Sequence, residues 1–235
     1  MFFTAEKLSL RIPEIIAAAT RDTRPVEGVL ACVAPGAPAE STMAAAPDPD
    51  APGWFALAPG MPWGGAPGLP PDAPQPSIGW NIPANGGGNH WLRATLAVPD
   101  EWRGRQVLLA LSWEDRGLAG SVEAIVYLDG RALAGIDEFH RAVLLPATAH
   151  DGTHELLIRC YTPYRRPFGG LGLQLRDETI FQLGCAMRAM LEAARTFRDA
   201  DPAGHALLAR LNTAYTLLDL REGWQSARFA ESARA

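Results

Sequence analysis

The sequence predicts an antiparallel β-sandwich, and three observations between Trp91 and Tyr161 lead to this fold class. Short segments there alternate apolar and polar residues with the period of two that is typical of a half-buried strand. The pair Asp129-Gly130 between two of these segments is a strong hairpin signal, because both residues tolerate positive φ. No helical pattern separates the segments, which favours packed antiparallel sheets over a parallel βαβ arrangement.

The expected strands follow one another at short intervals. In the segment 106–113, alternate apolar residues from Val107 to Trp113 lie on one face, as a sheet that covers a core requires. Another segment, 123–128, leads into the Asp129-Gly130 turn, and Arg131 begins the return strand. The remaining candidates are 91–99, 140–145, 154–161 and a closing strand at 171–175.

Helical patterns flank the expected sandwich. Residues 4–20 carry an apolar stripe, in which Pro13 predicts either a kink or a junction of two short helices. Asp177 can cap a second helix, because apolar residues recur after it at steps of three and four. Asp201-Pro202 predicts the start of a third helix, and a further one is expected from about Gly223-Trp224 through Phe229.

The segment 34–88 differs from the rest of the chain in composition. It holds more than half of the prolines together with many Ala and Gly residues, but it also contains Trp54, Trp63 and Trp80. Because large aromatic side chains are costly to leave in water, we interpret it as an irregular strap along the sandwich. The chain then divides into an N-terminal helix and lead-in strand (1–33), the strap (34–88), the sandwich core (89–176) and a helical segment (177–235).

Composition narrows the class of protein. The formal net charge of -5 argues against a nucleic-acid-binding surface, which needs concentrated Lys and Arg. The three cysteines are odd in number and lack a CxxC spacing, which favours buried free thiols over a disulfide framework or a metal site. No secretory signal pattern and no apolar run of membrane-spanning length occurs, so we expect a cytoplasmic location.

The sequence contains few motifs that carry chemistry. His150 and His154 have the spacing of two metal ligands on a helix, but the residues between them are typical of a turn and no third ligand is near. Asp137 precedes His140 by three residues, an arrangement that orients an imidazole in some enzymes and more often fixes a loop. Neither GxSxG nor HExxH is present. None of these motifs is sufficient for an enzyme.

Several segments, in this order and spacing, together resemble a known family. They are Pro62-Trp63-Gly64-Gly65, Trp91-Leu92-Arg93, 98–105, 126–130, Gly135-Ile136-Asp137 with His140, His154-Glu155-Leu156, Leu211-Asn212 and 218–221. They resemble the N-terminal region of the α-mannosidases of glycoside hydrolase family 38, from about Arg24 onward and without a clear counterpart for 34–59. Val-Pro, Trp-x-Gly-Arg and the Val-Tyr-Leu-Asp-Gly hairpin also resemble the sugar-binding sandwich of glycoside hydrolase family 2.

The resemblance implies a galactose-binding-domain-like jelly roll that precedes an α/β barrel. In that family the barrel carries zinc and an aspartate nucleophile in a motif resembling Gly-His-Ala-His-Ile-Asp, which this sequence does not contain. The resemblance therefore implies no catalytic residue, metal ligand or cofactor in these 235 residues, with zinc expected in a separate catalytic domain. It implies a non-catalytic N-terminal domain of a glycosyl hydrolase acting on α-mannosides, inactive alone, with the barrel as its partner.

An independent carbohydrate-binding module is the alternative function. Exposed tryptophan rings stack on sugar faces while polar side chains bind hydroxyls. The candidate residues are Trp63, Trp80 and Trp102, together with Asp137 and His140. We prefer the interpretation in which these tryptophans pin the strap to the sandwich. A domain that only serves assembly, as part of a homo-oligomer, is the third hypothesis.

Overall fold

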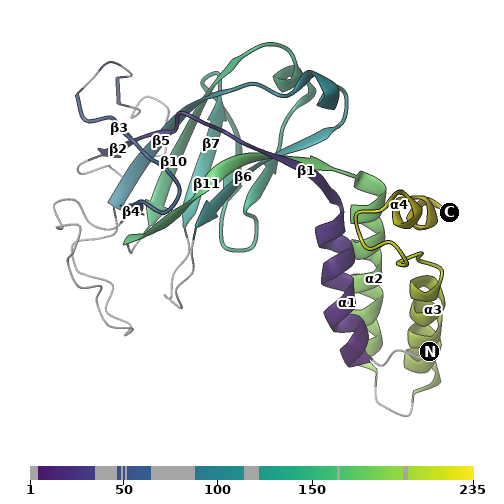
Figure 1. The fold of residues 1–235 in the computed structure, drawn as a ribbon. Coiled ribbons are helices and arrows are strands. Elements are labelled where there is room, and N and C mark those ends of the chain that lie inside the picture. The colour runs from purple at the N-terminus through teal and green to yellow at the C-terminus, as the bar shows by residue number, and fades with distance from the viewer. Residues whose placement is uncertain are drawn as a thin grey trace, which may run out of the picture. The chain divides into compact units, whose positions relative to one another are not determined.

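A computed structural model describes residues 5–34, 47–48, 50, 52–64, 88–113, 122–162, 165–197 and 201–235. The chain forms two compact units, of which one is Arg24–Gln174 and the other combines Met1–Thr23 with Leu175–Ala235. The elements of each unit are labelled in Figure 1. Much of the strap expected at 34–88 lies outside the described residues.

The unit Arg24–Gln174 is built from β-sheets, which confirms the expected fold class of a β-sandwich with helices. Within the described residues, one sheet has the strand order β3-β2-β5-β10-β7-β8, and the other has the order β1-β11-β6-β9, with β4 paired to β11. The strands β5, β10, β7 and β8 pair in this order, and each pair is antiparallel. The strands are β1 (Thr20–Pro25), β2 (Leu30–Ala34), β3 (Phe55–Ala56), β4 (Pro62–Gly64), β5 (Gly88–Leu96), β6 (Gln106–Trp113), β7 (Glu123–Leu128), β8 (Arg131–Ile136), β9 (Ala142–Leu144), β10 (His154–Thr162) and β11 (Arg165–Arg176).

Both faces of the sheet that contains β5 and β10 carry buried apolar residues. On one face Leu92 lies opposite Ile158, and both side chains are buried. On the other face, Trp91, Tyr127 and Leu157 form a separate buried cluster, against which Trp54 packs. The central strands are therefore apolar on both faces, and Trp54, from the expected strap, lies against the sheet as large aromatic residues require.

The described residues of the helical unit form four helices. They are α1 (Ala5–Ala18), α2 (Glu178–Thr196), α3 (Pro202–Thr216) and α4 (Ala227–Arg234). Pro13 lies inside a single helix α1, so the alternative of two short helices is wrong. Leu8, Ile12 and Ile15 of α1 are buried in the core of this unit, and this packing outweighs the lost backbone hydrogen bond. No described helix is long and apolar enough to cross a membrane.

Two aspartates begin helices as the sequence predicts. The Asp177 carboxylate accepts a hydrogen bond from the Ile180 N–H (3.3 Å) at the start of α2, and Asp201 accepts one from the Ala203 N–H (2.8 Å) at the start of α3. Each carboxylate satisfies an orphan donor of the first helical turn. The second oxygen of Asp177 pairs with the guanidinium of Arg234 at the end of α4. Asp177 thus joins the start of one helix to the end of another.

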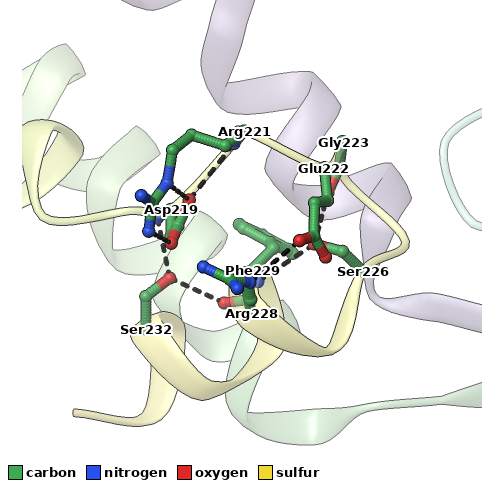
Figure 2. A network of polar contacts seen from close by, with 8 residues as sticks. All are labelled: Asp219, Arg221, Glu222, Gly223, Ser226, Arg228, Phe229 and Ser232. Atoms are coloured by element: carbon green, nitrogen blue, oxygen red, sulfur yellow. Dashed lines mark hydrogen bonds and ion pairs between the residues drawn. The ribbon is translucent and has the colours of Figure 1, made fainter.

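A polar network organises the segment that precedes α4 (Figure 2). The Asp219 carboxylate accepts hydrogen bonds from the Arg221 side chain. The backbone N–H of Asp219 donates to Ser232 Oγ (2.9 Å). Ser226 caps α4 by accepting from the Phe229 N–H (3.1 Å). The last helix therefore begins at Ala227, after this cap, and not at Gly223-Trp224 as expected.

The Asp219 carboxylate makes the helical unit sensitive to acid. The Arg221 guanidinium and backbone N–H lower the pKa of Asp219 from its ordinary 3.8 to about 2. A carboxylate with a lowered pKa contributes stability above pH 3.8, and this contribution is lost as the pH falls toward 2. We expect Asp219→Asn to be less stable than the wild type at neutral pH, and the difference to vanish across this acid window. Urea unfolding of both proteins at several pH values measures it, and a difference independent of pH would contradict the assignment.

Candidate functional site

Two of the tryptophans expected to bind sugar, Trp63 and Trp102, are buried in the described structure. Trp63 is 3% exposed and packs edge-on against Phe168, with ring centroids 5.7 Å apart. Trp102 is 2% exposed in a 3-10 turn, Asp100–Trp102. Trp80 lies outside the described residues. Burial of the two described rings favours the packing interpretation, because a ring that stacks on a sugar must offer a face to solvent.

The structure does bring Asp137 and His140 together, in the turn between β8 and β9. The backbone N–H groups of Phe139 and His140 both donate to Asp137 Oδ1, at 2.8 and 2.7 Å. The imidazole Nδ1 of His140 lies 3.0 Å from the same oxygen. The Asp137 N–H closes the turn by donating to the His140 carbonyl oxygen (3.2 Å). A single carboxylate therefore fixes both the turn and the histidine ring.

These contacts keep the Asp137 carboxylate ionised. The side-chain hydrogen bond from His140, and then the backbone hydrogen bonds, lower the pKa of Asp137 below its ordinary value, so this carboxylate is ionised at neutral pH. An ionised carboxylate only accepts hydrogen bonds, so Nδ1 of His140 carries a proton and donates. Nε2 then points away from Asp137. The His140 side chain as a whole is 75% exposed.

Phe139 lies at the tip of this turn and was missed by sequence reasoning. Its side chain is 85% exposed. The available signal was the pair Asp137 and His140 itself, because a carboxylate that accepts hydrogen bonds from backbone N–H groups two and three residues later forms a turn, and the side chains between lie outside it. Arg141 follows the turn directly. Its guanidinium lies 4.3 Å from the centroid of the buried Trp113 ring, and this contact anchors the end of the turn.

We expect Asp137→Ala to loosen this turn without unfolding the sandwich. The two N–H groups that donate to the carboxylate would lose their acceptor and exchange with solvent roughly tenfold faster, because local opening no longer breaks these bonds. Hydrogen exchange of the Phe139 and His140 amides, followed by NMR, measures the effect. Glu138→Ala is the matched control, because Glu138 accepts a hydrogen bond from Arg141 through its backbone carbonyl oxygen, which the substitution keeps. Equal exchange in both variants would show that the carboxylate does not hold the turn.

A second polar site lies at the turn between β7 and β8. Asp129 has φ 47° and Gly130 has φ 77°, as the predicted hairpin requires. Asp129 Oδ2 lies 2.6 Å from Nδ1 of His154, and this hydrogen bond is the largest cause of a lowered pKa of Asp129. Nε2 of His154 lies 3.0 Å from the Asp151 carbonyl oxygen. Both nitrogens of His154 are therefore engaged within the fold.

An open depression of about 390 Å³ adjoins His154, and its lining includes Arg93, Thr95, Thr153 and Glu155. Arg93 and Glu155 pair across it, with Nε and Oε1 3.1 Å apart. His150 is buried and does not join His154 in a ligand set. Among the described residues there is no group of three or more His, Cys, Asp or Glu side chains that could hold a metal ion.

A family model described as alpha-mannosidase, jelly roll domain, matches residues 87–162. This segment, about a third of the chain, is similar to an alpha-mannosidase jelly roll domain. The jelly roll match runs from β5 to β10 and includes both the Asp137 turn and the pair Asp129 and His154. It confirms the resemblance on which the sequence interpretation depended. No curated protein matches the sequence at a significant level.

Solved structures that resemble this chain include β-glucuronidases. The enzyme of Faecalibacterium prausnitzii is 16% identical with a TM-score of 0.37, and the match covers 67% of this chain and 32% of that one. The enzyme of Ruminococcus gnavus in complex with D-glucuronic acid is 12% identical with a TM-score of 0.27, over 38% of this chain and 20% of that one. The chain therefore spans a third or less of the length of these proteins.

Proposed function

We propose that this chain is the non-catalytic N-terminal region of an α-mannosidase, in which the jelly roll and the helical unit support a catalytic α/β barrel. The match of residues 87–162 to the alpha-mannosidase jelly roll domain carries this proposal. The sequence contains no Gly-His-Ala-His-Ile-Asp motif. In the proposed enzyme the zinc and the nucleophile therefore belong to the barrel, and α-mannosides are the substrates of that enzyme.

The contacts of the described carboxylates support the proposal that this region is non-catalytic. The Asp129 carboxylate contacts His154 at the start of β10, the Asp137 carboxylate contacts His140 of its own turn, and Glu155 is paired with Arg93. A retaining glycosidase needs two carboxyl groups that face a sugar from opposite sides, whereas each of these carboxylates contacts a side chain of the chain itself. All three cysteines are free thiols, which supports a cytoplasmic location for the proposed enzyme.

The proposal is tested by the reading frame that contains this sequence. We expect it to encode an α/β barrel with a Gly-His-Ala-His-Ile-Asp motif after residue 235. A reading frame without a barrel would contradict the proposal. The biochemical arm compares the 235-residue chain with the longer protein on 4-nitrophenyl α-D-mannopyranoside. Only the longer protein should hydrolyse it, and hydrolysis by the short chain, abolished by a substitution within that chain, would also contradict the proposal.

The role in assembly is tested separately. The longer protein and a version that lacks residues 1–235 are incubated at increasing temperature, and the remaining mannosidase activity and the molar mass in solution are measured. If this region supports the barrel, the truncated protein loses activity at a lower temperature. A change in molar mass assigns the oligomer contact to this region, and equal inactivation with equal mass would reject both roles.

A carbohydrate-binding function is the second candidate, and one observation favours it. The turn 137–140 carries an exposed aromatic ring and an exposed imidazole on consecutive residues, and the Asp137 carboxylate orients the imidazole. Such a combination is typical of weak sugar contacts. The other expected stacking residues that the structure describes, Trp63 and Trp102, are buried and add nothing to this function.

A further inference from the structure

We propose that the turn 137–140 is a contact site for a hexopyranoside, with Phe139 as the stacking platform and His140 as the group that binds a ring hydroxyl. This inference rests on the second candidate function, which it makes specific, and it does not depend on the supporting role. The turn belongs wholly to the unit Arg24–Gln174, so the site needs no residue of the helical unit.

The exposure of Phe139 is the first observation. At 85% it is the most exposed large apolar side chain among the described residues. A ring that remains in water contributes almost nothing to the hydrophobic free energy of folding, and the turn would form equally well with a small polar residue at this position. Phe139 is therefore not explained by the stability of the sandwich.

The rigidity of the turn is the second observation. The Asp137 side chain accepts hydrogen bonds from two backbone N–H groups and from the His140 imidazole. The Asp137 backbone N–H closes the turn by donating to the His140 carbonyl oxygen. On the far side, Arg141 donates from Nε to the Glu138 carbonyl oxygen (3.3 Å) and rests on the buried ring of Trp113. The Phe139 ring is thus carried by a fixed backbone, and a ligand that stacks on it loses little entropy in ordering the loop.

The third observation is the chemistry beside the ring. Because Nδ1 of His140 donates to the Asp137 carboxylate, Nε2 of the neutral imidazole accepts a hydroxyl proton, and that of the imidazolium donates to a hydroxyl oxygen. A sugar hydroxyl satisfies either form. An apolar ring and a group that binds hydroxyls, on consecutive residues of one turn, match a pyranose, which has a C–H face and hydroxyls at its rim.

The neighbourhood of the ring favours a sugar over a protein partner. The residues of β8 that face solvent before the turn include Ala132 and Ala134, which are too small to extend Phe139 into an apolar patch. A protein hot spot needs surrounding contacts that exclude water from the anchor. A single aromatic face with one or two hydrogen bonds is enough for a weak sugar contact, with Kd on the order of millimolar.

The test is a titration of the 15N-labelled 235-residue chain with methyl α-D-mannopyranoside to about 50 mM, followed by amide chemical shifts. We expect saturable shifts at residues 138–141. Phe139→Ala should raise Kd by about fivefold or more, as the removal of an aromatic anchor does, and His140→Ala should raise it by less. Phe139→Trp should retain binding.

Leu144→Ala is the matched control, because Leu144 is a 50% exposed apolar residue of the adjacent strand β9 and lies outside the turn. It should leave Kd unchanged. No shift at the highest sugar concentration, or shifts confined to the depression at Arg93 and Glu155, would overturn the proposal. Shifts at 138–141 that follow protein concentration and not sugar would assign the turn to a protein contact and overturn it as well.

Discussion

Replacement of Phe229 by alanine is expected to lower the free energy of unfolding of the helical unit by about 3–5 kcal/mol. The Phe229 ring is 0% exposed and belongs to the core formed by all four helices. It meets Trp224 edge-on, with ring centroids 5.3 Å apart. The removal of this ring leaves a cavity that the surrounding helices fill only in part.

Urea unfolding followed by circular dichroism at the helix band measures the loss. Phe139→Ala is the matched control, since the same chemical change at an 85% exposed ring should alter the free energy of unfolding by less than about 0.5 kcal/mol. If the two variants were destabilised equally, Phe229 would not be part of the core, and the placement of α4 against the other helices would be wrong.

Gly169→Ala is expected to destabilise the sandwich by about 1–3 kcal/mol. Gly169 lies in β11, and a Cβ atom added there would stand 2.8 Å from the backbone carbonyl carbon of Ser112 in β6 and 2.5 Å from its Oγ. The two strands are neighbours in one sheet, so the backbone of Ser112 cannot move away without a change in the pairing of β6. Glycine is therefore required by the close approach of two strands.

Gly135→Ala is the control for this substitution. Gly135 also lies in a strand, β8, but an added Cβ would be 3.6 Å from the nearest atom, the Ala124 carbonyl oxygen, which is an ordinary contact. Thermal unfolding of the two variants should give a clearly lower melting temperature for Gly169→Ala alone. Equal melting temperatures would mean that β6 and β11 are not as close as the structure places them.

The parts of this fold that local chemistry determines could be predicted from the sequence. The hairpin at Asp129-Gly130 requires positive φ at two adjacent residues, and few other pairs tolerate it. The starts of α2 and α3 follow from Asp177 and Asp201, because a carboxylate before an apolar stripe satisfies the first N–H groups of a helix. These signals operate within four residues and do not depend on the rest of the chain.

The parts that depend on distant residues could not be predicted. The sequence gives no local reason for α1 to pair with α2, which begins 160 residues after α1 ends. The contact depends on Gly184, where an added Cβ would lie 2.5 Å from Ile16 Cγ1. The burial of two residues of the candidate sugar site could not be predicted for a similar reason. Trp63 and Trp102 are in loop-like sequence, and only tertiary packing decides that their rings are buried.

The double engagement of Asp177 has a consequence for how the helical unit melts. One oxygen holds the first turn of α2, and the other holds the guanidinium at the end of α4. If α4 separates from the other helices, Arg234 no longer contacts Asp177, and the Asp177 carboxylate gains rotational freedom. Fraying at the end of α4 therefore loosens the first turn of α2. The start of α2 and the end of α4, 57 residues apart, are thus linked through one carboxylate. Their backbone amides should lose protection from hydrogen exchange in one cooperative event.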